Sequence, residues 1–599
     1  MITSMRNGEI DVVITMDGKH MHLKARGGRR LKELLRDAKI SVSMPCGGNG
    51  RCGKCVITFV SGAPKAGTLD RNFLSDKELL AGKRLLCRCI LDSDCAIDLS
   101  KSASSLSLEE KMVVEGVERS GKAGASYCDK FGIAIDIGTT TVVAALVGRV
   151  KGGTGNASEH QQDTDGSDSK ALDCIVIDTR AVVNHQRQFG ADVISRIDAA
   201  ADPDTRVQLQ DLILSDIGSM ISQLITDNQV KELSEVVISG NTTMIYLLLG
   251  NDASGLGVYP YKADELNRSV AKIDIGKLFG EGVKSLNMAA CSIAKVRIMP
   301  GISAFVGADI VSGLYYLNMA DGLANSGETN RDEADMLRKA LFIDLGTNGE
   351  MAYYDGNELR VTSTAAGPVF EGGGISCGVA SVPGAISHVT IEGQNDGNGS
   401  EPGGLKVIYE IIGDTKRFEY PKGTGDEAAQ APVGLCGTGV IEAVAELRRN
   451  NIINSDGLLS DKYFENGFLL AAKADGSHIA ITQQDIRNVQ LAKAAINAGM
   501  DTLLAGDKPG TIYIAGGFGA GLNEEKIRGI RLFSKNYCDN INVVGNSSLR
   551  GAVKYLENVL WGKEDEEEQR LAKITDRAKE IVLAGEESFD ERYMDALGF

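Results

Sequence analysis

The chain reads Cys46-Gly47-Gly48-Asn49-Gly50-Arg51-Cys52-Gly53-Lys54-Cys55, and a second stretch, Leu85-Leu86-Cys87-Arg88-Cys89, follows about thirty residues later. Three thiolates spaced C-x5-C-x2-C and a fourth one further on can converge on a [2Fe-2S] cluster. Glycines let such a loop wrap closely around an inorganic core and aim backbone N–H groups at its sulfides. The pattern therefore predicts a cluster held by Cys46, Cys52, Cys55 and one cysteine of the second stretch.

Two other kinds of site also use cysteines. A structural zinc site prefers paired C-x2-C motifs, and this region contains one such pair. A disulfide framework is typical of small secreted chains, whereas this chain has 599 residues and no apolar signal core in its first ten. Zinc and disulfides stay as alternatives to iron and sulfur on this evidence alone.

The segments around the cysteines favour iron and sulfur. Hydrophobic periodicity and an Asp17-Gly18 turn predict a compact order of strands and helices. The expected elements are strands at 10–16, 21–25, 56–60 and 96–99 and helices at 30–39 and 75–82. This order resembles the β-grasp ferredoxins, and Arg84-Leu85-Leu86-Cys87 resembles the segment that carries the fourth ligand in their adrenodoxin-like branch. The resemblance implies that Cys87, rather than Cys89 or Cys95, completes the ligand set.

Two later stretches share one pattern. Each is an apolar strand that ends at an aspartate, then a glycine turn with hydroxyl or amide side chains, then a second apolar strand. The first copy carries Asp136, Gly138, Thr139, Thr140 and Thr141, and the second carries Asp344, Gly346, Thr347 and Asn348. Glycine turns and Thr hydroxyls can bind phosphate oxygens, and an aspartate at a strand end can hold Mg²⁺ or position water. The repetition indicates an internal duplication, which is more specific than either copy.

A third stretch, 511–519, is an apolar strand that runs into Gly516-Gly517, where the backbone can pass flat against a nucleotide. The three motifs in this order resemble the superfamily of acetate and sugar kinases, heat-shock-70 proteins and actin. The resemblance implies an ATP and Mg²⁺ cleft between two duplicated halves, with Asp136 and Asp344 beside the phosphates and Gly516 and Gly517 beside the adenosine. The sequence has no G-x-x-x-x-G-K-[ST], so a P-loop ATPase is a poor alternative.

Segments between these motifs carry a more specific resemblance. They are 184–197, 239–244, 364–372 and 434–439, and they look like the reductive activators of corrinoid-dependent enzymes. The implied fold is a multi-domain α+β and α/β protein, with an N-terminal β-grasp [2Fe-2S] ferredoxin followed by a duplicated actin/heat-shock-70-like ATPase fold. The implied domains are 1–100 for the ferredoxin, 101–130 for a flexible linker, 131–340 for the first ATPase half and 341–599 for the second.

The same resemblance implies an ATP-dependent activator that passes one electron from the cluster to cob(II)alamin of a corrinoid protein and restores cob(I)alamin for methyl transfer. Its cofactors would be a [2Fe-2S] cluster, ATP and Mg²⁺, with Asp136 and Asp344 as catalytic residues. Its partners would be a corrinoid protein of a methyltransferase system and an upstream donor, either a ferredoxin or a reductase, with a homodimer as a further option.

Two other functions stay open. One is a small-molecule kinase of the same superfamily with a regulatory cluster, which would need an additional Asp as general base. The other is a ferredoxin-like electron carrier whose ATPase half only senses nucleotide.

The charge of the chain is unevenly distributed. Residues 1–100 hold 17 Lys and Arg against 11 Asp and Glu, a net charge of +6, and the remainder holds 47 against 70, a net charge of −23. A basic electron-transfer module could dock on the acidic body or on an acidic redox partner, and a solvated charged surface is the alternative.

Composition also excludes some partners. The sequence has no basic stripe interleaved with aromatic residues, so no nucleic acid is expected, and no apolar run of membrane-spanning length, so no membrane is expected. Twelve cysteines in such a chain suit thiolate ligation in the cytoplasm. The polar tracts 152–172, 321–335 and 395–430 are predicted to be solvated loops, and the charged segment 564–599 an exposed C-terminal helix.

Overall fold

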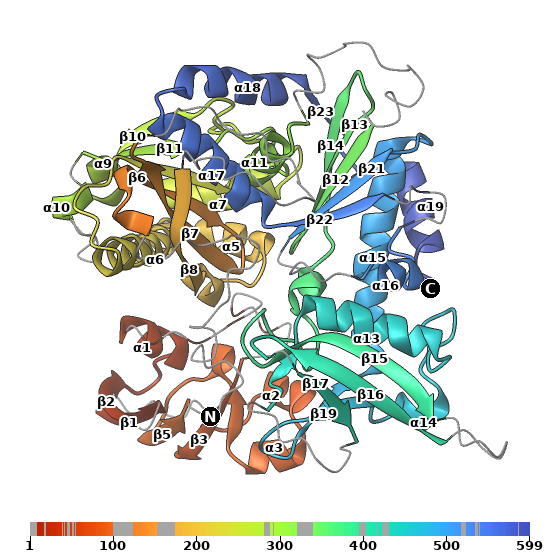
Figure 1. Ribbon diagram of the computed structural model, residues 1–599. Coiled ribbons are helices and arrows are strands. Elements are labelled where there is room, and N and C mark those ends of the chain that lie inside the picture. The colour runs from red at the N-terminus through yellow and green to blue at the C-terminus, as the bar shows by residue number, and fades with distance from the viewer. Residues whose placement is uncertain are drawn as a thin grey trace.

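The computed structural model of the chain places a small N-terminal module beside two larger sheets with their helices (Figure 1). The residues that the structure describes are 9–16, 19–38, 40, 42, 44, 48, 50, 53, 55–99, 124–152, 174–280, 288–291, 293–319, 339–394, 403–414, 416–421, 431–516, 523–533, 537, 540–584 and 586–599. Most of the predicted linker, residues 101–123, and the Asp17-Gly18 turn lie outside these ranges.

The N-terminal module, residues 9–99, is a five-stranded sheet with short helices and the strand order β2-β1-β5-β3-β4. Its elements are β1 (Glu9–Met16), β2 (Lys19–Arg26), α1 (Leu31–Asp37), β3 (Val56–Ser61), α2 (Thr68–Phe73), α3 (Asp76–Leu80), β4 (Lys83–Leu85), η1 (Leu86–Arg88) and β5 (Cys95–Asp98). Ile10, Val12 and Ile14 of β1 are buried because successive side chains of a strand point to opposite faces. The predicted order of strands and helices is confirmed, and α2 and β4 are additional to it.

The two larger sheets each have six strands and share the topology of five of them, while the sixth, β10 or β23, lies at opposite edges. Their strand orders are β10-β11-β9-β6-β7-β8 and β22-β21-β12-β13-β14-β23. In each sheet an antiparallel hairpin, β6–β7 or β12–β13, continues into a third antiparallel strand, β8 or β14. On the other side of the hairpin's first strand lies a parallel strand, β9 or β21. The predicted internal duplication is therefore confirmed at the level of topology.

The elements around the first sheet run from residue 128 to residue 316. They are β6 (Cys128–Ile137), β7 (Thr141–Val150), β8 (Cys174–Val183), η3 (His185–Gln188), α5 (Val193–Ala200), α6 (Pro203–Asp227), β9 (Glu235–Gly240), α7 (Thr242–Leu249), α8 (Ser254–Gly257), β10 (Ala271–Asp274), α9 (Ile275–Phe279), α10 (Met288–Cys291), β11 (Lys295–Ile298) and α11 (Ala308–Tyr316). Among the described residues, no helix is both long and apolar enough to cross a membrane.

The second sheet and its neighbours follow. These elements are β12 (Ala340–Leu345), β13 (Gly349–Tyr354), β14 (Leu359–Thr364), η5 (Pro368–Glu371), β15 (Ala385–Gln394), β16 (Gly403–Ile411), β17 (Arg417–Tyr420), β18 (Gly434–Leu435), α13 (Gly437–Arg449), α14 (Asp461–Phe464), β19 (Phe468–Ala472), β20 (His478–Ile481), α15 (Gln483–Leu504), β21 (Thr511–Gly516), α16 (Glu524–Gly529), β22 (Ile541–Gly545), α17 (Ser547–Leu560), α18 (Glu564–Arg577), β23 (Ala578–Glu580) and α19 (Glu587–Asp595).

Two expectations for the polar segments are wrong. Residues 403–411 and 417–420, within the predicted loop 395–430, form β16 and β17 of a four-stranded sheet, because every second residue, Val407, Tyr409 and Ile411, is buried on one face of β16. The segment 564–599 is helical in α18 and α19, as predicted, but it is not one exposed helix. Within it, α18 buries Glu567, and β23 separates the two helices and joins the second sheet beside β14.

Helix α17 returns from the C-terminal part of the chain and packs on the first sheet, against β6, β7 and β9 (Figure 1). Its approach to α11 is close, because a Cβ on Gly551 would lie 2.0 Å from the Ser312 carbonyl oxygen. Leu556, further along α17, would lie 2.6 Å from a Cβ on Gly132 of β6. The first sheet is therefore completed by residues more than two hundred positions away in sequence.

We expect Gly551→Ala to destabilise the protein, because the new methyl group overlaps the Ser312 carbonyl and forces α17 away from α11. Overpacking of this kind costs about 1–3 kcal/mol and outweighs the roughly 1 kcal/mol that alanine gains over glycine in a helix. The matched control is Gly276→Ala in α9, where a Cβ would meet nothing within 4 Å. Thermal unfolding should shift down for Gly551→Ala and stay level or rise for Gly276→Ala, and equal shifts would contradict the packing argument.

Candidate functional site

The first hairpin is the turn between β6 and β7, which contains Gly138, Thr139 and Thr140. The Gly138 amide donates to the Thr141 carbonyl at 2.9 Å and closes the turn. A Cβ on Gly138 would lie 2.7 Å from that carbonyl oxygen, so the turn has room only for glycine. The Thr140 hydroxyl donates to Glu371 Oε2 at 2.8 Å.

Three side chains from other elements hold this turn. Asn184 Nδ2 donates to the Gly138 carbonyl at 2.9 Å, and Asn241 Nδ2 donates to Thr139 Oγ1 at 3.1 Å. Arg196 donates to the Thr139 carbonyl and is fully buried, and burial together with the nearby charge of Arg187 lowers its pKa to about 9. A cation therefore lies next to the hairpin, where it favours an anionic ligand.

The second hairpin is the turn between β12 and β13, which contains Gly346, Thr347 and Asn348. The Gly346 amide donates to the Asn348 carbonyl at 3.0 Å, and Asn348 Nδ2 donates to Glu350 Oε1 at 3.1 Å. The Thr347 hydroxyl donates to Glu371 Oε2 at 2.8 Å. The two hairpins thus meet at one carboxylate oxygen, and the duplicated motifs lie together in one cleft.

Five carboxylates gather between the hairpins, from Asp136, Asp309, Asp344, Glu350 and Glu371. Burial raises the pKa of every one of them. The charges of Asp309, Asp136 and Glu371 add to burial and hold the pKa of Asp344 well above its usual range. Burial and the charge of Asp136 raise the pKa of Asp309 to about 7. Crowded like charges of this kind favour a bound cation.

Among the described residues, no group of three or more His, Cys, Asp or Glu side chains is placed to hold a metal ion by itself. Mg²⁺ usually takes one or two protein carboxylates and completes its shell with phosphate oxygens and water. The chemistry of the cleft fits that mode of binding, with carboxylates beside two turns that offer hydroxyl donors.

Asp136 is oriented by the start of α17. Asn546 Nδ2 donates to Asp136 Oδ2 at 2.8 Å, and the Ser548 hydroxyl donates to Oδ1 at 2.6 Å. The Ser548 hydroxyl also lies 2.9 Å from that of Ser239, which lies 3.0 Å from that of Ser312. These buried hydroxyls tie β6, β9, α11 and α17 together behind the carboxylate.

Gly516 lies at the end of β21, where the parallel register places it beside Leu345, one residue beyond the Asp344–Ala515 pair. Its φ of +129° is a conformation that residues with a side chain rarely adopt. Strand β21 therefore ends beside the residue that precedes the second turn. Gly517 lies outside the described residues.

The N-terminal module places two of the four predicted cluster ligands. Cys55 and Cys87 are buried, and a Cβ on Gly48 of the cluster loop would lie 3.7 Å from Cys87 Cβ. Cys46 and Cys52 lie outside the described residues. Cys87 therefore faces the loop that carries the other predicted ligands.

The glycines of this loop allow its backbone to turn tightly around a cluster. Gly48, Gly50 and Gly53 have φ values of +77°, +75° and +66°, in the left-handed region that favours glycine. A Cβ on Gly53 would lie 2.5 Å from the ring of Phe73, so α2 packs directly on the loop. The residues present thus fit a [2Fe-2S] cluster at this position.

Several residues of the cleft have no role in the sequence analysis. They are Asn184, Arg196, Asn241, Asp309, Glu371, Asn546 and Ser548. The first three and Glu371 lie in segments that resemble the reductive activators, and their sequence alone indicates no individual role for them. Asn546-Ser547-Ser548 has the composition of a helix N-cap, which predicts a helix start and no ligand.

Three known protein families match the chain. They are the 2Fe-2S iron-sulfur cluster binding domain at residues 14–92, the RACo middle region at 172–322, and the C-terminal ASKHA domain of RACo at 338–599. A solved reductive activator for a corrinoid, iron-sulfur protein is 26% identical, with a TM-score of 0.60 over 99% of this chain and 98% of that one. These matches confirm the predicted fold class.

Two curated relatives are also similar. The corrinoid activation enzyme RamQ of Eubacterium limosum is 27% identical over 648 residues, which cover 94% of this chain and 95% of the relative. The Co(II) methylated amine-specific corrinoid protein reductase of Methanosarcina barkeri is 27% identical over 429 residues, which cover 68% of this chain and 70% of the relative.

We expect Cys87→Ser to remove the cluster and Cys89→Ser to retain it. Cys87 faces the cluster loop at Gly48, whereas Cys89 is a buried thiol whose pKa is raised by its burial and by the charge of Asp70. Iron, acid-labile sulfide and the EPR signal of the reduced protein, measured after anaerobic purification, check this. Loss of the cluster in Cys89→Ser with retention in Cys87→Ser would reverse the assignment.

We expect Asp309→Asn to flatten the pH dependence of stability in the nucleotide-free protein. Because the pKa of Asp309 rises from 3.8 to about 7 on folding, the folded state holds its proton more tightly, and stability falls as pH rises between those values. The midpoint temperature of thermal unfolding should fall more steeply between pH 5 and 8 for wild type than for the variant. The control is Asp475→Asn at an exposed position, and parallel curves for wild type and Asp309→Asn would contradict the assignment.

Proposed function

We propose the function of this chain from the premise that it belongs to the RACo family of reductive activators, with a 2Fe-2S domain, a middle region and a C-terminal ASKHA domain. The chain uses ATP to transfer one electron to cob(II)alamin of a corrinoid protein and so restores cob(I)alamin for methyl transfer. The relatives support this assignment, since they include a corrinoid activation enzyme and a corrinoid protein reductase.

One observation supports a coupling between ATP binding and electron transfer. The N-terminal module and the body meet at a cavity of about 180 Å³, lined on one side by Met44 and Leu86 and on the other by Gln188 and Phe189. Leu86 immediately precedes Cys87. The surface beside the cluster thus faces the end of η3 across this cavity.

The other end of η3 holds the first hairpin. Asn184, its N-cap residue, donates to the Gly138 carbonyl and receives a hydrogen bond at its own carbonyl from Arg187. The Asn184 amide also donates to the Thr140 carbonyl at 2.9 Å. A movement of the hairpin on nucleotide binding would therefore displace η3, whose other end lies beside the N-terminal module that carries the cluster.

Each part of the site has a role in this proposal. A [2Fe-2S] cluster on Cys46, Cys52, Cys55 and Cys87 would supply the one-electron chemistry. Asp136 and Asp344 hold the Mg²⁺ of ATP or orient the attacking water. The phosphate oxygens are bound by the two hairpins, through Gly138, Thr139, Thr140, Thr141, Gly346, Thr347 and Asn348. Gly516 and Gly517 border the adenosine.

The energetics explain why an ATPase is joined to a ferredoxin. Plant-type clusters have potentials near −400 mV. An electron transfer that is uphill by roughly 200 mV would cost about 4.6 kcal/mol, at tenfold in the equilibrium constant per 59 mV. Binding and hydrolysis of ATP can offset a gap of this size by closing the cleft and gating the back reaction.

The remaining partners are part of the same proposal. An upstream ferredoxin or reductase delivers the electron, and its docking is favoured by the net charge of +6 on residues 1–100. We place the protein in the cytoplasm, where reduced thiols are retained, and a homodimer is a further option.

We expect Asp344→Asn to lose ATP-dependent electron transfer while its cluster stays intact. The substitution keeps the shape of the side chain and removes a charge beside the phosphates, and the cluster ligands belong to a separate module. Reduction of cob(II)alamin on the partner protein is measured with and without ATP, and should fall by orders of magnitude only in the presence of ATP.

The control is Asp475→Asn, the same change at an exposed position outside the cleft, which should match wild type. Cluster content and reduction by dithionite should be equal in all three proteins. Equal rates with and without ATP in the wild type and in Asp344→Asn would contradict coupling and leave a ferredoxin joined to an unrelated nucleotide-binding domain.

A further inference from the structure

Glu371 occupies a place in the cleft that no motif of the sequence assigns. Its Oε2 atom accepts hydrogen bonds from Thr140 and Thr347, each at 2.8 Å. These hydroxyls belong to the two different hairpins. A Cβ on Gly346 would lie 3.6 Å from its Oε1 atom, so the carboxylate lies directly over the second turn. One side chain thus bridges both halves of the duplicated fold.

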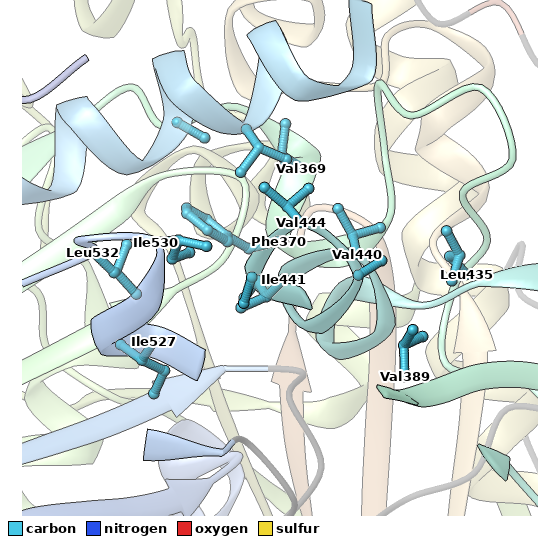
Figure 2. Packing of buried hydrophobic residues seen from close by; sticks show 14 of the residues in the cluster. Val369, Phe370, Val389, Leu435, Val440, Ile441, Val444, Ile527, Ile530 and Leu532 are labelled. Carbon is cyan, nitrogen blue, oxygen red and sulfur yellow. The ribbon is translucent and has the colours of Figure 1, made fainter. Parts of the chain in front are cut away.

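The backbone that delivers this carboxylate is fixed by the core. Phe370, its neighbour in η5, is 1% exposed and packs with Ile441 and Val444 of α13, as Figure 2 shows. A Cβ on Gly437, the first residue of α13, would lie 1.8 Å from the Phe370 carbonyl oxygen, so the helix start touches the η5 backbone. Glu371 is therefore held over the hairpins by a rigid base, and only its side chain has freedom to move.

The charges around Glu371 favour a carboxylate that can be replaced by another anion. Thr140 and Thr347 are its hydrogen-bond partners, and both are neutral. Burial raises the pKa of Glu371, and the charge of the nearby Arg196 offsets that effect only in part. The negative charge of Glu371 adds to the repulsion felt by Asp344 in the same cleft. Because burial outweighs the attraction of Arg196, this carboxylate can move away when a phosphate takes its place beside the same cation.

A hydroxyl has a single proton to donate. While Thr140 and Thr347 donate to Glu371, neither can donate to a phosphate oxygen. A carboxylate oxygen and a phosphate oxygen are both anionic acceptors, and they compete for the same two donors and repel each other.

We propose that Glu371 is an internal stand-in for phosphate, which latches the two hairpins together in the nucleotide-free cleft and is displaced when a nucleoside triphosphate enters. This inference rests on the proposed ATP site and adds a residue that controls access to it. Glu371 acts as a positioning residue for both threonines and sets the affinity for the phosphate chain.

The test is the binding of Mg-AMPPNP, a non-hydrolysable analogue, to wild type, Glu371→Gln and Glu371→Ala, by calorimetry on the full chain. Both variants remove the competing charge, and alanine also removes the acceptor. We expect at least tenfold tighter binding for alanine and a smaller gain for glutamine. The matched control is Glu557→Gln, which removes the same charge from a carboxylate ten residues along α17 from Ser547, where burial raises the pKa of Glu557 to about 7. The affinity of this variant should change less than threefold.

Hydrogen exchange of the hairpin amides gives a second readout. Without nucleotide, residues 138–141 and 346–348 should exchange faster in Glu371→Ala than in wild type, and with saturating Mg-AMPPNP the two should be equal. A merely structural role would leave the variant faster in both states.

The outcomes separate the two proposals. If wild type does not bind Mg-AMPPNP, the proposed ATP site is wrong. If wild type binds and Glu371→Ala binds equally or more weakly, the latch is wrong and the ATP site stands. An equal gain in Glu371→Ala and Glu557→Gln would also overturn the latch, because general loss of negative charge would then explain the effect.

Discussion

The structure depends on one electrostatic constraint, which is that five carboxylates are buried together where the two halves of the chain meet. Burial raises the pKa of each group, and the negative charges of neighbouring carboxylates raise it further for Asp309, Asp344 and Glu350. The folded protein withstands this repulsion because hydrophobic packing holds the strands and turns that carry the acids. Phe342, Ile343 and Leu345 of β12 are fully buried around Asp344, so the strand cannot retreat from the cleft. The same buried charges that lower the stability of the empty site are the ones that the proposed function assigns to Mg²⁺ and phosphate binding.

This constraint also explains why the far end of the chain returns to the first sheet. Among the residues that the structure describes, the side chains that donate to Asp136 are the uncharged Asn546 and Ser548 at the start of α17, and they stabilise its carboxylate. A helix N-terminus favours a carboxylate through its dipole as well as through its donors. The hydroxyls of Ser239 and Ser312 extend that contact into β9 and α11. The first hairpin and Asp136 therefore reach their observed arrangement only when residues near 548 have folded onto them.

The sequence was sufficient to predict what is encoded locally. An apolar strand that ends in Asp-x-Gly-Thr specifies its own hairpin, and its repetition predicted the shared topology of the two sheets. Cys46 and Cys52 stay predicted ligands, because the spacing names them and they lie outside the described residues. Asp309 and Glu371 could not be predicted, because neither lies in a repeated pattern and each reaches the cleft through tertiary packing. The strands β16 and β17 were missed because a polar composition concealed the alternation of Val407, Tyr409 and Ile411.

The short η3 segment shows how the two modules can act on each other. Gln186 is fully buried and donates to the Leu209 carbonyl at 2.9 Å, and His185 is held by Asp216 through its amide at 3.1 Å and its ring at 2.6 Å. A segment anchored so closely to α6 cannot absorb a displacement of the first hairpin by bending within itself. Under the proposed function, it would transmit that displacement to Phe189 and to the neighbouring surfaces of α5 and α6 that line the cavity beside Leu86. Residues 185–188 lie between Asn184, which is bonded to the first hairpin, and Phe189 at that cavity. The rigid anchors of these four residues, rather than any flexibility of the chain, are what the proposed communication between nucleotide and cluster depends on.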